Sequence, residues 1–347
     1  MNRRTFVAAG SSLAASVAFA PGLFAQTRDT PPEHAWPEAR WSEAASLPLQ
    51  IQELYPCVHQ GELYVAGGIA ARMGVPYFTN RCFAYSPKGD SWRELPELPV
   101  DLHHAALVSN SHDLFCVGGF AGSYTRVWAM QDAVYKLTPD GWQLINRLPS
   151  PQAEGVIAHH QDGNIHLVTG QNPKGADNAQ RSDHTETHNH WVWDTVSDQW
   201  RDAEPIPTAR NSATGGWMGN QLVVTGGRTA QGNLNVTEIY DVQGDHWHSG
   251  APLPLPQAGT ASVVVNEGLL VFGGEIFTPE AKVFANVWLY NLQEDRWHPV
   301  ADLPTPRHGL GAGLIGQKIY VIGGATAPGG SGTSDLNEAL TLQHKSL

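Results

Sequence analysis

Residues able to bind a metal ion or to move protons gather in one short segment. Between positions 183 and 190 the sequence holds Asp183, His184, Glu186, His188 and His190. Alternate side chains of an extended chain point to the same side, so the histidines and Glu186 would face one ligand. Imidazole and carboxylate groups arranged in this way bind Fe(II), Zn²⁺ or another divalent cation. The segment is therefore a candidate metal site, with His184, Glu186 and His188 as ligands.

Two other interpretations of this segment stay open. Its histidines and Glu186 could act as general acid and base on a lid over a binding site, without any metal. Alternatively, the segment is a polar loop whose last part, from His190, enters a strand.

A second group of polar residues follows a regular spacing. A tryptophan followed seven positions later by a proline occurs six times, and a Gly-Gly pair begins nineteen residues after five of these prolines. Polar side chains stand three to five positions after the prolines and within four positions after the glycines. The candidate acid–base residues among them are Glu154, Glu275, His103 and His308. The candidate ligand-binding residues are Glu53, Arg72, Gln171, Arg210, Asn211, Arg228 and Arg307.

Such residue types suit a polar small molecule. Arginine and amide side chains bind carboxylates and hydroxyls, while a carboxylate beside a histidine can exchange protons with a bound group. The structural alternative is that Arg210 and Arg307 brace neighbouring repeats and that a lone histidine such as His103 is merely hydrogen-bonded.

The spacing itself indicates a repeat fold. The six tryptophans, Trp41 to Trp297, lie 51, 50, 58, 47 and 50 residues apart, which is typical of stacked supersecondary units. An aromatic residue precedes five of them by seven positions, and short apolar runs with Gly, Asn or Asp turns predict four strands per unit. Trp41 has no partner strands before it, and a strand expected near residues 337–342 has no tryptophan strand after it. We therefore predict that the Trp41 strand completes the last sheet and removes two exposed edges.

The Gly-Gly, aromatic and tryptophan pattern resembles the kelch repeat from about residue 36 to residue 343. The resemblance implies an all-β fold, a six-bladed kelch-type β-propeller with four-stranded blades whose ring is closed by an N-terminal strand. Because the first two strands of each blade are antiparallel, the candidate residues are expected to converge at one mouth of the central channel. The third repeat departs from the pattern, with Thr169 in place of the first glycine and Trp193 in place of tyrosine, so we expect function there.

The first 25 residues differ from the rest of the chain. Arg3-Arg4-Thr5-Phe6 precedes an uncharged, Ala-rich stretch that ends around Ala25. This pattern predicts an export signal of the twin-arginine type, cleaved after Ala25, and hence a periplasmic or secreted bacterial protein whose single domain spans residues 26–347. Cleavage after Ala20 and a retained N-terminal anchor are the alternatives.

The composition excludes some partners. The net charge is −12, with no basic run, so neither nucleic acid nor, after signal cleavage, a membrane surface is an expected partner. Three cysteines do not make a disulfide framework. Cys116 is predicted to lie in the core, and the pattern leaves a Cys57–Cys82 pair undecided.

Three functions are compatible with these features. Signal, size and blade count resemble the N-acetylneuraminate epimerase (mutarotase) family, which implies Glu154 or Glu275 as base and Arg210, Arg228 or Arg307 as clamp for a sugar carboxylate. The 177–190 loop is similar in kind to the iron-binding loop of plant nitrile-specifier proteins, which implies a metal enzyme. The third function is a non-enzymatic binding module, a common use of kelch propellers.

Overall fold

The computed structural model describes residues 39–123 and 125–342; the predicted signal segment, residues 1–25, lies outside the described residues. This part of the chain is built from β-strands and one 3-10 helix at Arg181–Asp183. Within the same ranges, no helix has the length and hydrophobicity needed to cross a membrane. The all-β prediction is therefore confirmed for the part of the chain that is described.

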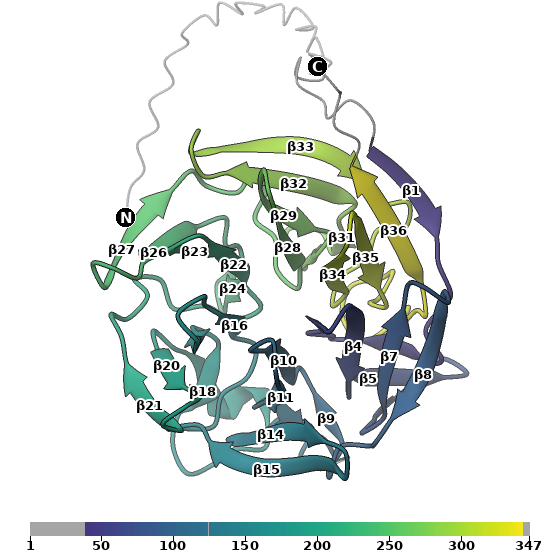
Figure 1. Cartoon of the computed structure of the whole chain (residues 1–347), viewed down its shortest axis with the longest axis horizontal. Helices are drawn as coiled ribbons and strands as arrows, with labels where there is room; N and C mark the ends of the chain where they lie inside the picture. Colours follow the sequence, from purple (N-terminus) through teal and green to yellow (C-terminus); the bar gives the residue numbers. More distant parts are fainter. Residues whose placement is uncertain (1–38, 124, 343–347) are drawn as a thin grey trace, which may run out of the picture. The chain divides into compact units, whose positions relative to one another are not determined.

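Six four-stranded antiparallel sheets make up most of these residues (Figure 1). We number them 1 to 6 along the chain. Sheet 1 contains β3 (Cys57–His59), β4 (Glu62–Ala66), β7 (Cys82–Ser86) and β8 (Ser91–Leu95). Sheet 2 contains β10 (Ala106–Ser109), β11 (Leu114–Val117), β14 (Ala133–Thr138) and β15 (Gly141–Arg147). Sheet 3 contains β16 (Val156–His159), β17 (Asn164–Val168), β20 (His190–Asp194) and β21 (Gln199–Asp202).

The other three sheets have the same strand order. Sheet 4 contains β22 (Thr214–Met218), β23 (Gln221–Thr225), β26 (Thr237–Asp241) and β27 (His246–Gly250). Sheet 5 contains β28 (Ala261–Val265), β29 (Gly268–Phe272), β32 (Asn286–Asn291) and β33 (Arg296–Asp302). Sheet 6 contains β34 (Gly311–Ile315), β35 (Lys318–Ile322), β36 (Asn337–Leu342) and β1 (Ala39–Glu43). The fold is a β-propeller.

Sheet 6 takes its outer strand from the other end of the chain. β1 pairs antiparallel with β36, with Trp41 opposite Leu340. The predicted pairing of the Trp41 strand with the C-terminal strand is therefore present. The first strands of the sheets contact one another in order from β3 to β34, and β34 also contacts β3.

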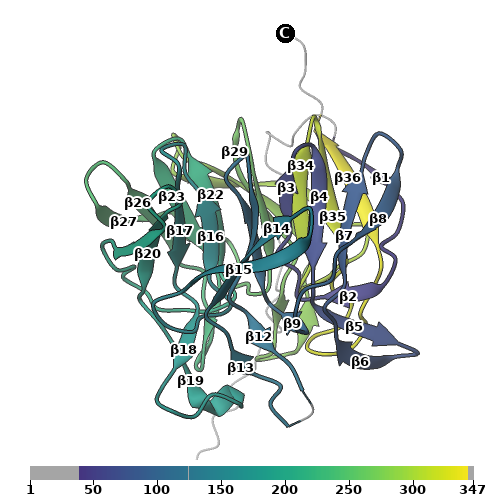
Figure 2. The same ribbon diagram turned by 60° about the horizontal axis from the view of Figure 1, so that its bottom comes forward.

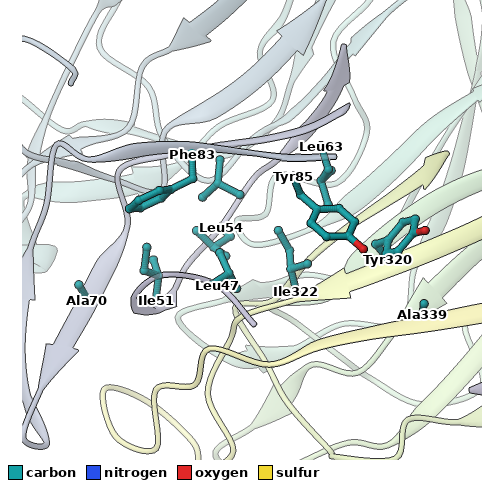
Figure 3. Packing of buried hydrophobic residues seen from close by; sticks show 11 residues of the cluster. Leu47, Ile51, Leu54, Leu63, Ala70, Phe83, Tyr85, Tyr320, Ile322 and Ala339 are labelled. Carbon is teal, nitrogen blue, oxygen red and sulfur yellow. The ribbon is translucent and has the colours of Figure 1, made fainter. Parts of the chain in front are cut away.

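Hydrophobic side chains fill the space between neighbouring sheets. Figure 3 shows one such cluster, in which Leu63, Phe83 and Tyr85 of sheet 1 pack with Tyr320 and Ile322 of sheet 6. Cys116 is fully buried in the cluster between sheets 1 and 2, as predicted. Cys57, Cys82 and Cys116 are all free thiols, so no Cys57–Cys82 disulfide forms.

The aromatic and tryptophan residues of each repeat help to join it to the preceding unit. An aspartate in the turn that connects the aromatic strand to the tryptophan strand takes part in this contact. The Tyr85 hydroxyl donates to Asp90 Oδ1 at 2.7 Å, and the same oxygen accepts the Ala45 N–H at 2.8 Å. The Trp92 indole N–H donates to the Ala45 carbonyl at 2.7 Å. The same arrangement recurs with Tyr240, Asp245 and Trp247 on Glu204, and with Tyr290, Asp295 and Trp297 on Ala251.

The Gly-Gly pair is explained by close contact with the next unit. The N–H of each second glycine, including Gly170, donates to the carbonyl of the residue three positions after the next proline, as Gly68 does to Leu102 at 2.7 Å. A side chain on the first glycine would collide with that carbonyl: a Cβ on Gly67 would lie 2.4 Å from Leu102 O. Thr169, the exception, has a left-handed φ of 55° and donates its hydroxyl to Arg210 O at 2.6 Å. Its departure from the pattern therefore has a structural reason.

Smaller sheets lie at one end of the four-stranded ones, as Figure 2 shows for β2, β5, β6, β9, β12, β13, β18 and β19. They are built from the segments after the prolines and after the glycines, which are the segments that were expected to converge. Their strands are β2 (Gln50–Gln52) with β5 (Ile69–Arg72) and β6 (Val75–Phe78), β9 (Leu102–His103) with β12 (Phe120–Ala121) and β13 (Ala129–Met130), β18 (Gln171–Pro173) with β19 (His184–Glu186), β24 (Arg228–Thr229) with β25 (Gly232–Asn233), and β30 (Glu275–Ile276) with β31 (Lys282–Val283).

Candidate functional site

The fifth residue after each proline has the same unusual backbone in all six repeats. These residues have positive φ values between 51° and 64°; they are Glu53, His104, Glu154, Ser212, Gly259 and Gly309. Left-handed backbone costs an L-residue with a side chain roughly 1–2 kcal/mol, and glycine avoids the cost. Two repeats therefore use the residue that suits the position, while four keep a polar side chain at the expense of strain.

The four polar side chains contact one another in chain order. His104 Nε2 lies 3.2 Å from Glu53 Oε2 and 3.4 Å from Glu154 Oε1. The Ser212 hydroxyl donates to Glu154 Oε1 at 3.3 Å.

Three further side chains join the two ends of this row. Arg228 Nη2 donates to Ser212 Oγ at 3.2 Å, and its Nη1 donates to Glu275 Oε1 at 2.6 Å. His308 then links the far side, with Nε2 3.5 Å from Glu275 Oε2 and Nδ1 3.7 Å from Glu53 Oε1. We call the seven side chains the polar circuit: Glu53, His104, Glu154, Ser212, Arg228, Glu275 and His308.

The polar circuit is buried, which strengthens the electrostatic interactions between its charged groups. The side chains of Glu154, Glu275, His104 and His308 are 1–2% exposed, and that of Glu53 is 12% exposed. Burial raises the pKa of Glu53, but the charge and hydrogen bond of His104 and the charges of His308 and Arg228 lower it more, to well below its usual range. Burial lowers the pKa of Arg228, but Glu154, Glu275 and Glu53 outweigh this and raise it.

A small cavity of about 120 Å³ lies against the circuit. Its lining includes residues that directly follow the strained positions: Leu54, Gly155, Ala213, Thr260 and Leu310. Tyr55 also lines it, and burial together with the charges of Glu154 and Glu53 raises the pKa of its hydroxyl. The cavity is smaller than the roughly 300–1,000 Å³ that is typical of small-molecule pockets.

Comparison with known proteins identifies the repeat. The family model described as the KLHDC2/KLHL20/DRC7 kelch-repeats domain matches residues 143–324, more than half of the 347-residue chain. The chain belongs to the kelch-repeat family. A kelch motif model also matches residues 56–99 of this kelch-repeat protein.

Similar proteins share the repeat over part of their length. The Kelch-like protein terF of Aspergillus terreus is 26% identical over 69% of this chain and 52% of its own length. The Kelch repeat and BTB domain-containing protein 12 of Danio rerio is 23% identical over 61% of this chain and 35% of its own length. The Kelch repeat protein C2 of Vaccinia virus is 27% identical over 38% of this chain and 24% of its own length. The chain thus spans about half or less of the curated relatives it matches.

Two predicted ligand-binding arginines of this kelch-repeat protein have structural partners instead. Arg210 is fully buried and donates from Nη1 to Glu238 Oε2 at 2.5 Å and from Nη2 to the Val224 carbonyl. Arg307 is equally buried, with Nη1 3.0 Å from Glu338 Oε2. Both arginines were expected to hold a ligand carboxylate. Instead, their guanidinium groups contact carboxylates on the third strands of sheets 4 and 6.

The other candidates are not members of the circuit. His103 is buried, stacks on Phe78 and Phe120, and contacts His104. Asn211 donates to Glu186 Oε1 at 3.1 Å, and Gln171 Nε2 lies 3.5 Å from the same oxygen. Arg72 is exposed at the end of β5.

The predicted metal ligands do not come together. The hypothesis assumed one continuous strand from His184 to His190, but β19 ends at Glu186 and His190 begins β20 in another sheet. His184 Nε2 lies 3.2 Å from Asn178 Oδ1, whereas His188 Nδ1 donates to the Ile206 carbonyl at 2.7 Å. Among residues 39–123 and 125–342, no group of three His, Cys, Asp or Glu side chains could hold a metal ion. The described structure therefore does not bring the predicted ligands of this loop together.

His104 was among the residues expected to converge at the channel mouth but was not chosen as catalytic or ligand-binding, whereas Ser212 was missed altogether. Both stand five residues after a proline, the spacing that also gives Glu53 and Glu154. Aligning the six repeats at that position would have found all four.

Proposed function

We propose that this kelch-repeat protein binds a small, neutral, hydroxyl-rich molecule at the polar circuit, and that a carbohydrate is the ligand class that fits best. The observation that carries the proposal is the strain at Glu53, His104, Glu154 and Ser212. Gly259 and Gly309 at the equivalent positions indicate that the fold does not need these side chains. Costly conformations that converge on one point are typical of binding and catalytic sites.

The charges favour a neutral ligand over a sugar acid. Each arginine that was expected to clamp a carboxylate already has a buried carboxylate partner: Glu238 for Arg210, Glu275 for Arg228 and Glu338 for Arg307. Carboxylates such as Glu53 accept hydrogen bonds from hydroxyls, and Phe277, 46% exposed and 5.5 Å from the Arg228 guanidinium, offers an aromatic face beside them.

The same groups are suited to proton transfer. Glu53 and Glu154 flank His104, and Glu275 contacts His308, so acids and bases adjoin one another out of water. Such pairs catalyse the opening and closing of a sugar ring, in which one group gives a proton and another takes one. In its enzymatic form the proposed function is therefore sugar mutarotation or epimerisation.

Anomer-exchange NMR with neutral and acidic sugars, together with thermal-shift binding, tests the proposal. We expect faster exchange or a raised melting temperature with neutral sugars, and loss of the effect in Glu154→Gln. Glu238→Gln is the matched control, because it removes a buried carboxylate that contacts Arg210 instead of the circuit. No response to any sugar, or equal losses in the two variants, would refute a carbohydrate site.

A second candidate function is binding of another macromolecule. The β5–β6 hairpin exposes Met73 by 96%, Val75 by 64% and Tyr77 by 36%. A cavity of about 280 Å³ adjoins it, lined by Pro76, Tyr77, Phe78, Asp101, Gly122 and Ser123. Exposed apolar clusters mark interaction surfaces. If the wild-type chain binds a macromolecule that the Met73→Asp, Val75→Asp variant no longer binds, and the circuit is unchanged in that variant, this function is supported.

We also infer the blade number and the location of the protein. Three features support six blades in a closed ring: six four-stranded sheets, the β1–β36 pairing, and the hydrogen bond from Gly324 N–H to Ile51 O at 2.9 Å, which repeats the link between the other sheets.

The paired arginines Arg3 and Arg4 support export to the periplasm or the medium. Cell fractionation of wild type against Arg3→Lys, Arg4→Lys tests the second inference: we expect export of the wild type and retention of the variant, and a wild type that stays in the cytoplasm would contradict it.

A further inference from the structure

Two adjacent histidines are hydrogen-bonded to each other at the edge of the polar circuit. His103 Nδ1 lies 2.7 Å from His104 Nδ1, and His103 Nε2 lies 2.7 Å from the Val127 carbonyl oxygen. Both rings are buried. Their nitrogens therefore have fixed neighbours, and the position of each proton follows from whether the neighbour accepts or donates.

The proton on His103 is assigned by its backbone partner. A carbonyl oxygen only accepts, so His103 Nε2 must carry a hydrogen. Burial lowers the pKa of His103 to about 3, which leaves the ring neutral, with one N–H only. His103 Nδ1 is then an acceptor, and the hydrogen between the two rings must belong to His104 Nδ1.

The other nitrogen of His104 faces negative charge. Nε2 has no aligned hydrogen-bond partner but lies between Glu53 Oε2 at 3.2 Å and Glu154 Oε1 at 3.4 Å. If His104 were neutral with its hydrogen on Nδ1, the Nε2 lone pair would point at two buried carboxylates, which is repulsive. A second hydrogen on Nε2 turns both contacts into attractive ones.

We propose that His104 carries a proton on both nitrogens in the ligand-free protein, and that His103 is the positioning residue that keeps it there. The circuit then holds an imidazolium between two carboxylates, ready to give a proton to a bound oxygen atom. The use of that proton in catalysis rests on the proposed function, whereas its presence does not. With Arg228, two cations face three carboxylates, which also favours neutral ligands over anions.

The surroundings of His104 are otherwise uncharged or distant from its ring. Tyr55 lies 6.2 Å away between ring centroids, and the Phe120 and Trp128 rings lie at 5.6 and 5.8 Å. Arg181 approaches the circuit only at Glu154, with Nη2 3.9 Å from Oε1, and its side chain is 53% exposed. The two carboxylates are thus the charged groups that decide the state of His104.

NMR of the full chain with ¹⁵N-labelled histidine tests the inference without any ligand. Near neutral pH both His104 nitrogens should show the shift of protonated imidazole, assigned by their loss in His104→Gln. His103→Leu should remove the Nδ1 proton, because its acceptor is gone, while His103→Asn, whose amide oxygen can accept, should restore it. His166, which has no carboxylate contact, is the internal control and should show one protonated nitrogen.

An unprotonated Nε2 on His104 in the wild type would put the proton on a carboxyl group and overturn the inference, whether or not the variants fold. If His104 is doubly protonated but no sugar exchanges, the proposed function fails and this inference stands. If sugars exchange and His104 is neutral, the reverse holds.

Discussion

Among residues 39–123 and 125–342, two buried histidine pairs have the same pattern of hydrogen bonds but differ in their last contact. In both, a backbone carbonyl fixes the first ring and the first ring fixes the second: Val127, His103 and His104 near the circuit, and Glu204, His190 and His166 in sheet 3. The distal nitrogen of His104 faces Glu53 and Glu154, whereas His166 Nε2 is buried without a hydrogen-bond partner.

The comparison shows that the last contact decides the chemistry. Around His166 and His190 the neighbours are the rings of Trp217 and Tyr240, and burial lowers the pKa of these histidines to about 3 and about 4. This second pair is neutral and belongs to the core. The first pair has the same pattern of hydrogen bonds, but the carboxylates beside its distal nitrogen favour an additional proton there.

Among single substitutions at neutral pH, breaking the contrast at its charged end should have the largest effect. Glu154→Leu leaves His104 with one carboxylate partner instead of two and removes one of the two acceptors of the Ser212 hydroxyl, and we expect a loss of about 3–5 kcal/mol in the free energy of unfolding. Urea denaturation measures it. Glu94→Leu, which breaks the exposed ion pair with Arg81, should cost less than about 1 kcal/mol. Equal losses would mean that the circuit is no more than an ordinary surface network.

The next prediction concerns the loss of stability in acid, which arises from the neutral histidines. In the unfolded chain a histidine has a pKa of about 6.5, so below that pH the unfolded state binds protons that His103, His166 and His190 refuse in the folded state. Stability should therefore fall as the pH drops from about 6.5 toward 4, by about 1.4 kcal/mol per pH unit for each such histidine.

Denaturation curves at several pH values test this expectation. His166→Phe should reduce the slope by the share of one histidine, while His298→Gln, in a partly exposed pair with Glu294, should leave it unchanged. A wild-type stability that stays flat over this range would contradict the assignment of the second pair as neutral.

The smallest effect concerns backbone strain, which separates the pairs as well. His104 has a φ of 54°, whereas His166 and His190 lie in regular strands. Gly259→Ala adds a side chain at the position equivalent to His104, where the nearest atom would be 3.6 Å away, so only the φ cost of roughly 1–2 kcal/mol is expected. A stability equal to wild type would remove the strain argument for the site.

The sequence was sufficient for the fold and for part of the site. The tryptophan and Gly-Gly spacing predicted the strands, and the antiparallel first hairpin predicted that Glu53, Glu154, Arg228, Glu275 and His308 converge. Arg210 and Arg307 were ambiguous because the partners that bury them, Glu238 and Glu338, lie on the third strands, at no fixed spacing that the pattern had used. The His184–His190 segment does not form the single strand that the metal hypothesis assumed, because alternation in sequence does not reveal where one strand ends and another sheet begins.

The union of β1 with β36 has a consequence for how the chain folds. Asn337 Nδ2 donates to the Ala45 carbonyl across 292 residues of sequence, so this contact forms only when both ends are available. Closing so long a loop carries a large entropic cost and slows folding. During synthesis, sheets 1 to 5 can assemble as their strands emerge, whereas β1 must wait unpaired until β36 is made, and β1 is therefore the strand through which two unfinished chains would pair with each other.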